Sequence, residues 1–269
     1  MKYGIISSLT LLLFACTAQK KAIVAAPAGN LVIDGKLWSS AFQQRAAEYK
    51  ALCLQAYNIA RLRVDERISS GAAASGKPWA IVTDIDETFL DNSPNAVHQA
   101  LAGKDYEAQA WTEWTSKGSA DTVPGALGFF HYAQSKHIEI YYITNRDEKD
   151  RAGTLANLQR YNFPYADNEH LLVRQTTSGK ESRRQQVAAA HEIMLLLGDN
   201  LSDFSDLFDK KTEAERDDHV RQLAGEFGKR FIVLPNCNYG GWEDAIYENR
   251  RDWTPVQKDS LIKAKLKSY

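Results

Sequence analysis

Beyond residue 77 the chain alternates short apolar runs with longer segments of mixed polarity. The apolar runs are rich in β-branched and aromatic residues, so we predict that each forms a strand. Nearly continuous apolar strands that alternate with helical segments indicate a parallel sheet with helices on both faces. The predicted strands are 79–83, 138–144, 171–174, 193–197 and 230–234, and two of the helices between them are 154–160 and 181–192.

The segment before the first strand has a different pattern. Between Ala41 and Ile68, apolar residues such as Ala56 and Ile59 recur at helical spacing, and neither Pro nor Gly interrupts them. The pattern ends at Gly71, a residue type that often follows the last turn of a helix. We therefore predict a helical segment over 41–76.

The first sixteen residues resemble a bacterial lipoprotein leader. Lys2 gives one positive charge, the apolar run 5–14 is too short to span a bilayer, and Cys16 follows it directly after Ala15. This order predicts a signal peptide over 1–15, lipidation of Cys16 and anchoring in the bacterial cell envelope, with the outer membrane as the expected membrane. An ordinary cleaved signal peptide with a coincidental cysteine is the alternative.

Composition excludes several broad classes of protein. Hydrophobic residues make up 44% of the 269 positions, which is too many for a disordered chain. The 33 basic and 34 acidic residues nearly cancel, which argues against a broad electrostatic grip on duplex nucleic acid. Three cysteines and six scattered histidines provide neither a disulfide framework nor the spacing of a zinc site. Once Cys16 is modified, Cys53 and Cys237 remain, and they either pair or stay free.

The stretch 71–77 matches the first part of a phosphate-binding P-loop, G-x-x-x-x-G-K. However, Pro78 occupies the position of the magnesium-binding Ser or Thr, and the stretch precedes a predicted strand. A P-loop follows a strand and opens a helix, so that its amides point at phosphate. We therefore interpret 71–77 as a linker.

The strongest chemical signal follows the first predicted strand, which leads directly into Asp84, Asp86 and Glu87. Side chains two residues apart at the end of a strand point roughly the same way, into the crevice at the carboxyl end of a parallel sheet. Carboxylates this close repel each other unless a cation or a proton relieves them. The spacing indicates either a metal site or a carboxyl group held protonated, and a loop of solvated acids is the alternative.

Three later segments add groups that suit a phosphate. Thr144 and Asn145 end the second strand, where they would hold phosphoryl oxygens or cap the next helix. Lys180 stands where a helix opens, a position that attracts an anion, although a solvated charge run is the alternative. Asp199 ends the fourth strand and is placed to bind a hard cation, with Asp203 placed to orient Lys180.

Together these elements resemble the haloacid dehalogenase (HAD) superfamily of phosphohydrolases. The resemblance is closer to its class C acid phosphatases, the lipoprotein e(P4)-like group of DDDD phosphohydrolases, and it extends from about residue 41 to the C-terminus. Cys237 departs from the small residue or proline that is usual in the group. The motifs that carry the resemblance are D-I-D-E-T-F-L-D-N-S-P at 84–94, Y-I-T-N-R at 142–146, S-G-K-E-S-R-R at 178–184, G-D-N-L-S-D-F at 198–204 and the C-terminal signature at 234–243.

The resemblance implies a HAD-like three-layer α/β sandwich, with a parallel-sheet core and a smaller helical cap. It also implies an aspartyl-phosphate mechanism in which Asp84 is the nucleophile and Asp86 gives a proton to the leaving alcohol and then activates water. The implied Mg²⁺ ligands are Asp84, the backbone carbonyl of Asp86 and Asp199; the implied phosphoryl-binding residues are Thr144, Asn145 and Lys180; and Asp203 is a supporting residue. The expected segments are a lipidated linker over 16–40, the helical segment over 41–76 as part of the cap, a core over 77–235 with a cap insert around 95–125, and a C-terminal part of the cap over 236–269.

The implied substrates are nucleoside monophosphates and aryl phosphates. By distance from the motifs, Trp111 and Tyr239 match the Trp and Tyr with which nucleotidases of this group clamp a base, and core positions in the cap are the alternative for both. The expected protein is a Mg²⁺-dependent acid phosphatase that acts as a nucleotidase of the cell envelope, with a homodimer implied by the resemblance alone and no nucleic-acid polymer as partner. The alternatives are a non-catalytic surface lipoprotein on the same fold, an adhesin or binding module, and phosphonate or phosphoryl-transfer chemistry on the same scaffold.

Overall fold

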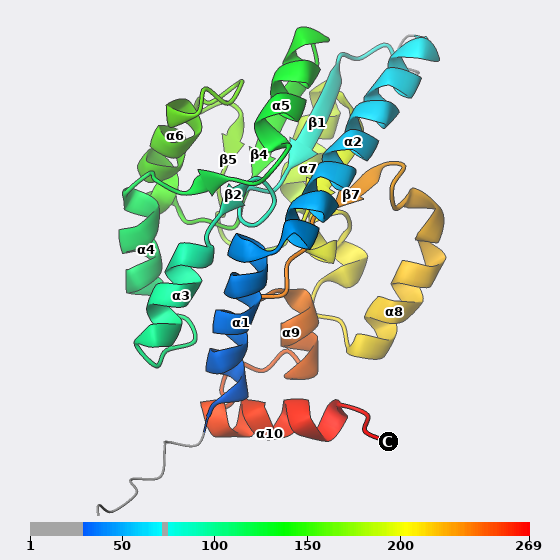
Figure 1. The fold of residues 1–269 in the computed structure, drawn as a ribbon. Helices are drawn as coiled ribbons and strands as arrows, with labels where there is room; N and C mark the ends of the chain where they lie inside the picture. Colours follow the sequence, from blue (N-terminus) through cyan, green and yellow to red (C-terminus); the bar gives the residue numbers. More distant parts are fainter. Residues whose placement is uncertain (1–28, 72–74) are drawn as a thin grey trace, which may run out of the picture.

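A parallel sheet of five strands forms the centre of the molecule (Figure 1). The computed structural model describes residues 29–71 and 75–269. The order across the sheet is β5-β4-β1-β6-β7, so β1 lies in the middle, and all five strands predicted from the sequence are confirmed. The strands are β1 (Trp79–Thr83), β4 (Glu139–Ile143), β5 (Leu171–Leu172), β6 (Glu192–Gly198) and β7 (Phe231–Val233).

Helices cover both faces of the sheet, as expected for three layers. On one face α2 (Ala47–Ser69), α5 (Ala126–Ser135) and α6 (Arg151–Arg160) enclose the larger core, in which Ile81 and Ile140 of the sheet meet Phe130 of α5. On the other face Val187 of α7 (Glu181–Ala190) packs with a smaller cluster that includes Phe231. The long helix α2 and the shorter α5 lie side by side in Figure 1.

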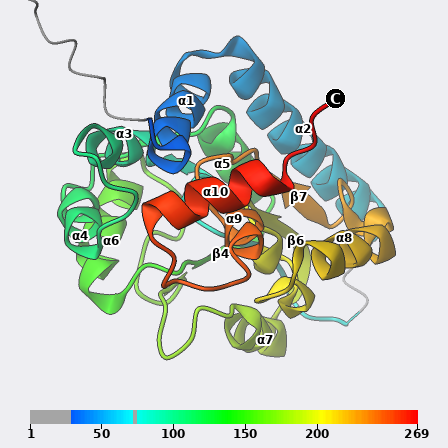
Figure 2. The ribbon, with the colours of Figure 1, turned by 90° about the horizontal axis from the view of Figure 1, so that it is seen from below.

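A group of helices lies at the carboxyl end of the sheet, where Figure 1 and the view from below in Figure 2 both place it. It consists of α1 (Leu31–Arg45), α3 (Ser93–Leu101), α4 (Ala108–Ser116), α9 (Gly241–Ile246) and α10 (Pro255–Lys265). In this cap α1 contacts both α3 and α10. The remaining elements are α8 (Glu213–Gln222), a small antiparallel sheet of β2 (Leu90–Asp91) and β3 (Asp121–Thr122), and the 3₁₀ turns Glu148–Asp150, Leu201–Asp203, Asp206–Phe208 and Ala224–Glu226.

The N-terminal helices differ from the sequence prediction in two ways. The first helix begins at Leu31, inside the expected linker 16–40, because the side chain of Asn30 accepts hydrogen bonds from the amides of Val32 and Ile33 and so caps the helix. A break at Ala46, which has extended backbone, then separates α1 from α2.

The helix α2 belongs to the core and not to the cap. Its buried side, which includes Cys53, Ala60 and Val64, packs into the same cluster as Ile81 of the central strand. Of the predicted segment 41–76, residues 41–45 belong to α1 and so to the cap, whereas the assignment of the following helix to the cap is corrected. The predicted signal peptide and Cys16 lie outside the described residues, and within the described part no helix is long and apolar enough to cross a membrane.

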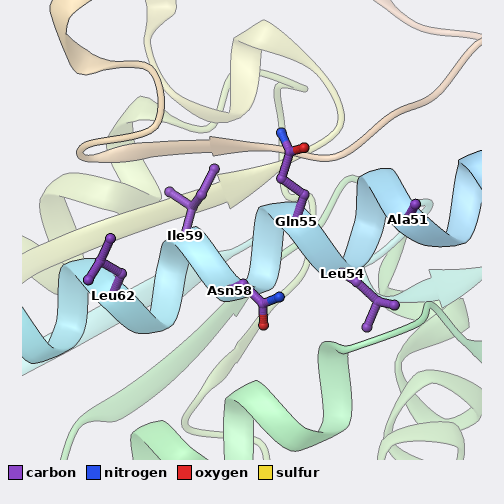
Figure 3. A pocket seen from close by; sticks show the side chains of 6 residues that line it. All are labelled: Ala51, Leu54, Gln55, Asn58, Ile59 and Leu62. Atoms are coloured by element: carbon purple, nitrogen blue, oxygen red, sulfur yellow. The ribbon is translucent and has the colours of Figure 1, made fainter.

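A shallow apolar groove of about 480 Å³ runs along the outer side of α2 (Figure 3). Leu54 and Leu62 in this groove are each about half exposed. The groove is lined by residues of α2 alone, with none of the acidic residues of the predicted site. It is therefore separate from the predicted chemistry.

The two cysteines in the described residues carry free thiols in different surroundings. Cys53 is fully buried in α2, and burial raises the pKa of its thiol to about 11, whereas Cys237 is exposed. In protein with Cys16 replaced by Ser, we expect a thiol reagent at pH 7.5 to label Cys237 quickly, and Cys53 only after unfolding in urea. Rapid labelling of both thiols in the native protein would contradict the packing of α2.

Candidate active site

The four chemical segments predicted from the sequence meet at the carboxyl edge of the sheet. Asp84 directly follows β1, and its amide donates to the carbonyl of Leu197 in β6, which extends the ladder by one residue. Thr144 follows β4, and Asp199 follows β6. Because β4, β1 and β6 are neighbours, their ends bring these side chains together.

Lys180 joins two of the predicted acids. Its ammonium group donates to Oδ1 of Asp84 and, at 2.7 Å, to Oδ1 of Asp203. The lysine side chain is only 4% exposed, so the ion pairs are shielded from water. Burial opposes the charge of Lys180, but Asp203 and Asp84 outweigh it and raise its pKa. Asp203 and Asp84 therefore both hold the Lys180 ammonium group.

Asp84, Asp199 and Asp203 form a compact group in which one oxygen from each lies within 4.8 Å of the others. Burial raises the pKa of Asp84 to about 7, and the charges of Asp203 and Asp86 add to this effect while Lys180 opposes it. Burial likewise raises the pKa of Asp199, with further contributions from Asp203 and Asp84. Three carboxylates, of which Asp84 and Asp203 are buried and Asp199 is partly buried, face one ammonium group and leave excess negative charge. Oxygen ligands of this kind suit a hard divalent cation.

Neutral side chains complete this acidic group. The hydroxyl of Thr88 lies 3.3 Å from Oδ2 of Asp84 and 3.3 Å from Oδ1 of Asp199. The amide of Asn236 donates to Oδ2 of Asp199 at 2.7 Å. These contacts fix the two carboxylates that the sequence assigned to the metal.

Asp86 points to different partners. Its carboxylate accepts hydrogen bonds from Arg146, with Nη2 at 2.7 Å and Nε at 3.0 Å from Oδ1, and from Asn92 at 2.8 Å. The Asp86 side chain is not among the carboxylates grouped around Asp84. The side chain of Asp86 is therefore held by Arg146 and Asn92 and not by the groups around Asp84.

The two predicted phosphoryl-binding residues after β4 accept hydrogen bonds from Arg146 and Arg183. Oγ1 of Thr144 accepts from the amide of Arg146 at 3.1 Å, and Thr144 is fully buried. Asn145 is exposed, and its Oδ1 accepts from Nη2 of Arg183 at 2.9 Å. Because its oxygen is engaged, the side-chain amide nitrogen is the group that Asn145 offers to a ligand.

The two predicted aromatic residues come from the cap and lie beside the acidic loop. The ring of Trp111 lies 5.6 Å from the guanidinium carbon of Arg146. The hydroxyl of Tyr239 donates to Glu87, and the residue is 36% exposed. Trp114 has a structural position instead, because its indole donates to Asn92 at 2.8 Å and its ring packs against the larger core.

The comparisons with known proteins decide the family. The model of HAD superfamily subfamily IIIB, acid phosphatase, matches residues 16–242. The chain belongs to this family. Two crystal structures of the class C acid phosphatase from Bacillus anthracis, one with tungstate bound, superimpose with a TM-score of 0.84 at 39% identity. The alignments cover 88% of this chain and 98% and 99% of those chains.

Two curated plant proteins are more distant relatives. The stem 31 kDa glycoprotein of Glycine max is 26% identical over 125 residues, which cover 44% of this chain and 49% of that protein. Acid phosphatase 1 of Solanum lycopersicum is 25% identical over 130 residues, covering 45% of this chain and 50% of that protein. The chain therefore spans about half the length of the curated relatives it matches.

The structure also shows contacts of the site for residues to which the sequence assigned no role. Arg146 and Arg183 stand inside quoted motifs, but nothing in the local spacing shows that they reach Asp86 and Asn145. Glu87 is 1% exposed, and burial raises its pKa to about 8. It accepts from the amide of Asn92 at 2.9 Å as well as from the Tyr239 hydroxyl. Its carboxyl group thus ties the C-terminal loop to the catalytic loop.

The raised pKa values predict how pH and a cation affect stability. The pKa of Asp84 rises from 3.8 to about 7, so the folded state keeps a proton that the unfolded state loses between about pH 4 and pH 7. In EDTA the Tm should therefore fall between pH 5 and pH 7.5. A bound cation favours the ionised carboxylates, so Mg²⁺ should raise the Tm more at pH 7.5 than at pH 5.

The control is Asp199→Asn, which removes one of the grouped carboxylates. We expect this variant to lose most of the Mg²⁺-dependent rise in Tm and to show a weaker pH dependence in EDTA. A rise in Tm that is equal at both pH values, or that persists in Asp199→Asn, would contradict the assignment of the metal site.

Proposed function

We propose that the protein is a Mg²⁺-dependent acid phosphatase that hydrolyses phosphomonoesters through an aspartyl-phosphate on Asp84. The observation that carries the proposal is the buried arrangement of Asp84, Lys180 and Asp203 next to Asp199. Burying this many charges costs free energy, and enzymes accept such a cost at active sites. Tungstate, the ligand in one relative, is a tetrahedral oxyanion like phosphate, which supports the same interpretation.

In the proposed mechanism, each group has a part in two displacements. In the first, a carboxylate oxygen of Asp84 attacks phosphorus, the bond from phosphorus to the leaving oxygen breaks, and Asp86 protonates that oxygen. In the second, Asp86 takes a proton from water as the water oxygen attacks phosphorus and releases Asp84. Donors from Lys180, Thr144 and Asn145 stabilise the phosphoryl oxygens in both steps.

The cation would be held by Asp84, Asp199 and the backbone carbonyl of Asp86. When bound, a divalent cation neutralises charge on the phosphoryl oxygens and on the carboxylates around them. The excess of buried carboxylates over ammonium groups fits such a cation. Mg²⁺ is proposed because it is commonly bound through one or two carboxylates together with substrate phosphate.

The aromatic residues suggest the class of leaving group. Trp111 and Tyr239 are contributed by α4 and the loop before α9, and both contact residues of the site, namely Arg146 and Glu87. A base or aryl group between the two rings would gain about 1–3 kcal/mol from stacking on each. Nucleoside monophosphates and aryl phosphates are therefore the proposed substrates.

The test is phosphate release at pH 5.5 with Mg²⁺ or EDTA, from nucleoside monophosphates, p-nitrophenyl phosphate and a sugar phosphate. Trp111→Ala should lower kcat/KM about 10-fold or more for the aromatic substrates, because one stacking surface is lost, and leave the sugar phosphate nearly unchanged. The matched control is Trp253→Ala, a half-buried tryptophan outside the site. An equal loss on all substrates would exclude the clamp, and no turnover by the parent protein would favour the binding-module alternative.

We also propose that the protein is anchored by a lipid on Cys16 and acts in the cell envelope as a nucleotidase. The support is the order of a basic residue, a short apolar run and a cysteine in the first sixteen residues. An envelope phosphatase would release nucleosides from external nucleotides. The outer membrane location and the homodimer stay predictions.

A further inference from the structure

The two carboxylate oxygens of Asp86 have unequal surroundings. Oδ1 receives three hydrogen bonds, from Nε of Arg146 at 3.0 Å, from Nη2 of Arg146 at 2.7 Å and from Nδ2 of Asn92 at 2.8 Å. From the residues that the structure describes, Oδ2 receives only a longer contact of 3.3 Å from Nε of Arg146. The Asp86 side chain is 15% exposed, so little water reaches it. One oxygen is saturated with donors, and the other is available to a ligand.

The donors that hold Oδ1 are themselves fixed. Arg146 is 2% exposed, and its Nη1 donates to Oγ1 of Thr154 in α6 at 3.0 Å, while the ring of Trp111 in α4 lies against the guanidinium group. Asn92 is 3% exposed, and its Oδ1 accepts from the indole of Trp114, also in α4, at 2.8 Å. The helix α4 therefore braces both donors, and neither can turn away without losing a buried hydrogen bond or a ring contact.

We infer that Arg146 and Asn92 are positioning residues that bind Oδ1 of Asp86 and thereby leave Oδ2 as the oxygen that carries the proton. The inference rests on the proposed phosphatase function. In the first displacement the proton moves from Oδ2 to the leaving oxygen as its bond to phosphorus breaks. In the second, Oδ2 takes a proton from water as the water oxygen bonds to phosphorus, which restores the starting state.

This arrangement serves both halves of the reaction without rearrangement. When Oδ2 carries the proton, Oδ1 is still an acceptor, so its three donors keep their partner in both protonation states. A carboxyl group that is free to rotate would present either oxygen, and proton transfer depends on a fixed geometry. The leaving group is proposed to stack on Trp111. The Arg146 guanidinium contacts this ring and also binds Asp86, so it connects the surface that binds the leaving group with the proton donor.

The dependence of rate on the leaving group tests this inference. A phenolate of low pKa departs without a proton, whereas phenol or a nucleoside needs one, so only poor leaving groups depend on the position of Asp86. For Arg146→Gln we expect kcat/KM to fall less than about 3-fold with 2,4-dinitrophenyl phosphate, and about 100-fold with phenyl phosphate and nucleoside monophosphates. Asn92→Ala removes one of the three donors. Its kcat/KM should follow the same trend, with a fall of about 10-fold for phenyl phosphate and nucleoside monophosphates.

The matched control is Arg216→Gln. Arg216 is another buried arginine that contacts an aromatic ring, that of Phe208, and it donates to the Phe208 carbonyl at 3.0 Å. This variant should keep the leaving-group dependence of the parent protein. Arg146→Lys keeps the charge but not the bidentate donor. Its loss of kcat/KM with phenyl phosphate and nucleoside monophosphates should therefore lie between that of the parent protein and that of Arg146→Gln.

The outcomes separate the inference from the proposed function. A uniform loss on every substrate in Arg146→Gln and Asn92→Ala would overturn the positioning role, because a general structural defect ignores the leaving group. If Arg146→Gln does not fold, Asn92→Ala and Arg146→Lys decide by the same comparison. If the parent protein is active and its variants lose kcat/KM equally with every leaving group, only the inference is refuted. If the parent protein releases no phosphate, the proposed function and the inference are both refuted.

Discussion

Replacing Asp84 by asparagine should abolish phosphate release, with a fall in kcat of about 10³-fold or more. An amide is a poor nucleophile and cannot form the acyl phosphate on which both displacements depend. In EDTA at pH 7.5 the same substitution should leave the Tm unchanged or raise it, because it removes a charge whose burial is unfavourable. Loss of turnover together with a retained Tm would show that the defect is chemical.

The matched control for this prediction is Asp167→Asn. Asp167 is also an aspartate with a close side-chain contact, its Oδ1 lying 2.8 Å from Nδ1 of His170, but it precedes β5 and its side chain is about half exposed. This variant should keep its turnover. A protein with Asp84→Asn that still releases phosphate at a rate near that of the parent would exclude Asp84 as the nucleophile.

Replacing Lys180 by methionine should lower both activity and stability. The substitution keeps most of the side-chain volume but leaves Asp84 and Asp203 buried without their shared cation. Breaking a buried ion pair in this way costs about 3–5 kcal/mol of the free energy of unfolding. Loss of a donor to the phosphoryl group should lower kcat/KM by about 10²–10³-fold.

The pH dependence and a second substitution test the cause of this loss. In EDTA the destabilisation should be larger at pH 8 than at pH 5, because Asp84, whose pKa burial raises to about 7, can take up a proton at the lower pH. Adding Asp203→Asn should restore part of the stability without restoring turnover. A Lys180→Met protein that is as stable as the parent in urea at pH 8 would contradict the buried ion pairs.

Much of the fold was predictable because strands and helices have different periods. The five strands are short apolar runs separated by helical segments, and a parallel sheet places all their carboxyl ends on one edge. For that reason Asp84, Thr144 and Asp199 could be placed near each other from the sequence. Their convergence follows from topology alone, without any knowledge of side-chain contacts.

The errors at the N-terminus have local physical causes. The helix that begins at Leu31 depends on one capping side chain, Asn30, and its apolar pattern is too weak to show a boundary. The break at Ala46 has no Pro or Gly to mark it, so the sequence pattern runs through it. Which helix packs against the sheet is decided by tertiary contacts. The local helical pattern does not contain this information, so it cannot assign α2 to the core.

Two long-range contacts of the site could not be predicted. Asp86 and Arg146 are separated by 60 positions, and Tyr239 lies 152 positions from Glu87. No periodic pattern relates residues so far apart, since only the arrangement of the loops and the cap brings them together. The bracing of the proton donor is therefore visible in the structure and not in the sequence.

The most direct test of the central claim is to trap the phosphoryl group on the protein. Parent protein with Mg²⁺ is mixed with p-nitrophenyl phosphate, quenched in acid within a turnover, digested and examined by mass spectrometry. We predict that the peptide containing Asp84 gains the mass of one phosphoryl group, and that the same peptide from Asp84→Asn gains none. Steady turnover with a phosphoryl group on another peptide, or on no peptide, would contradict the account.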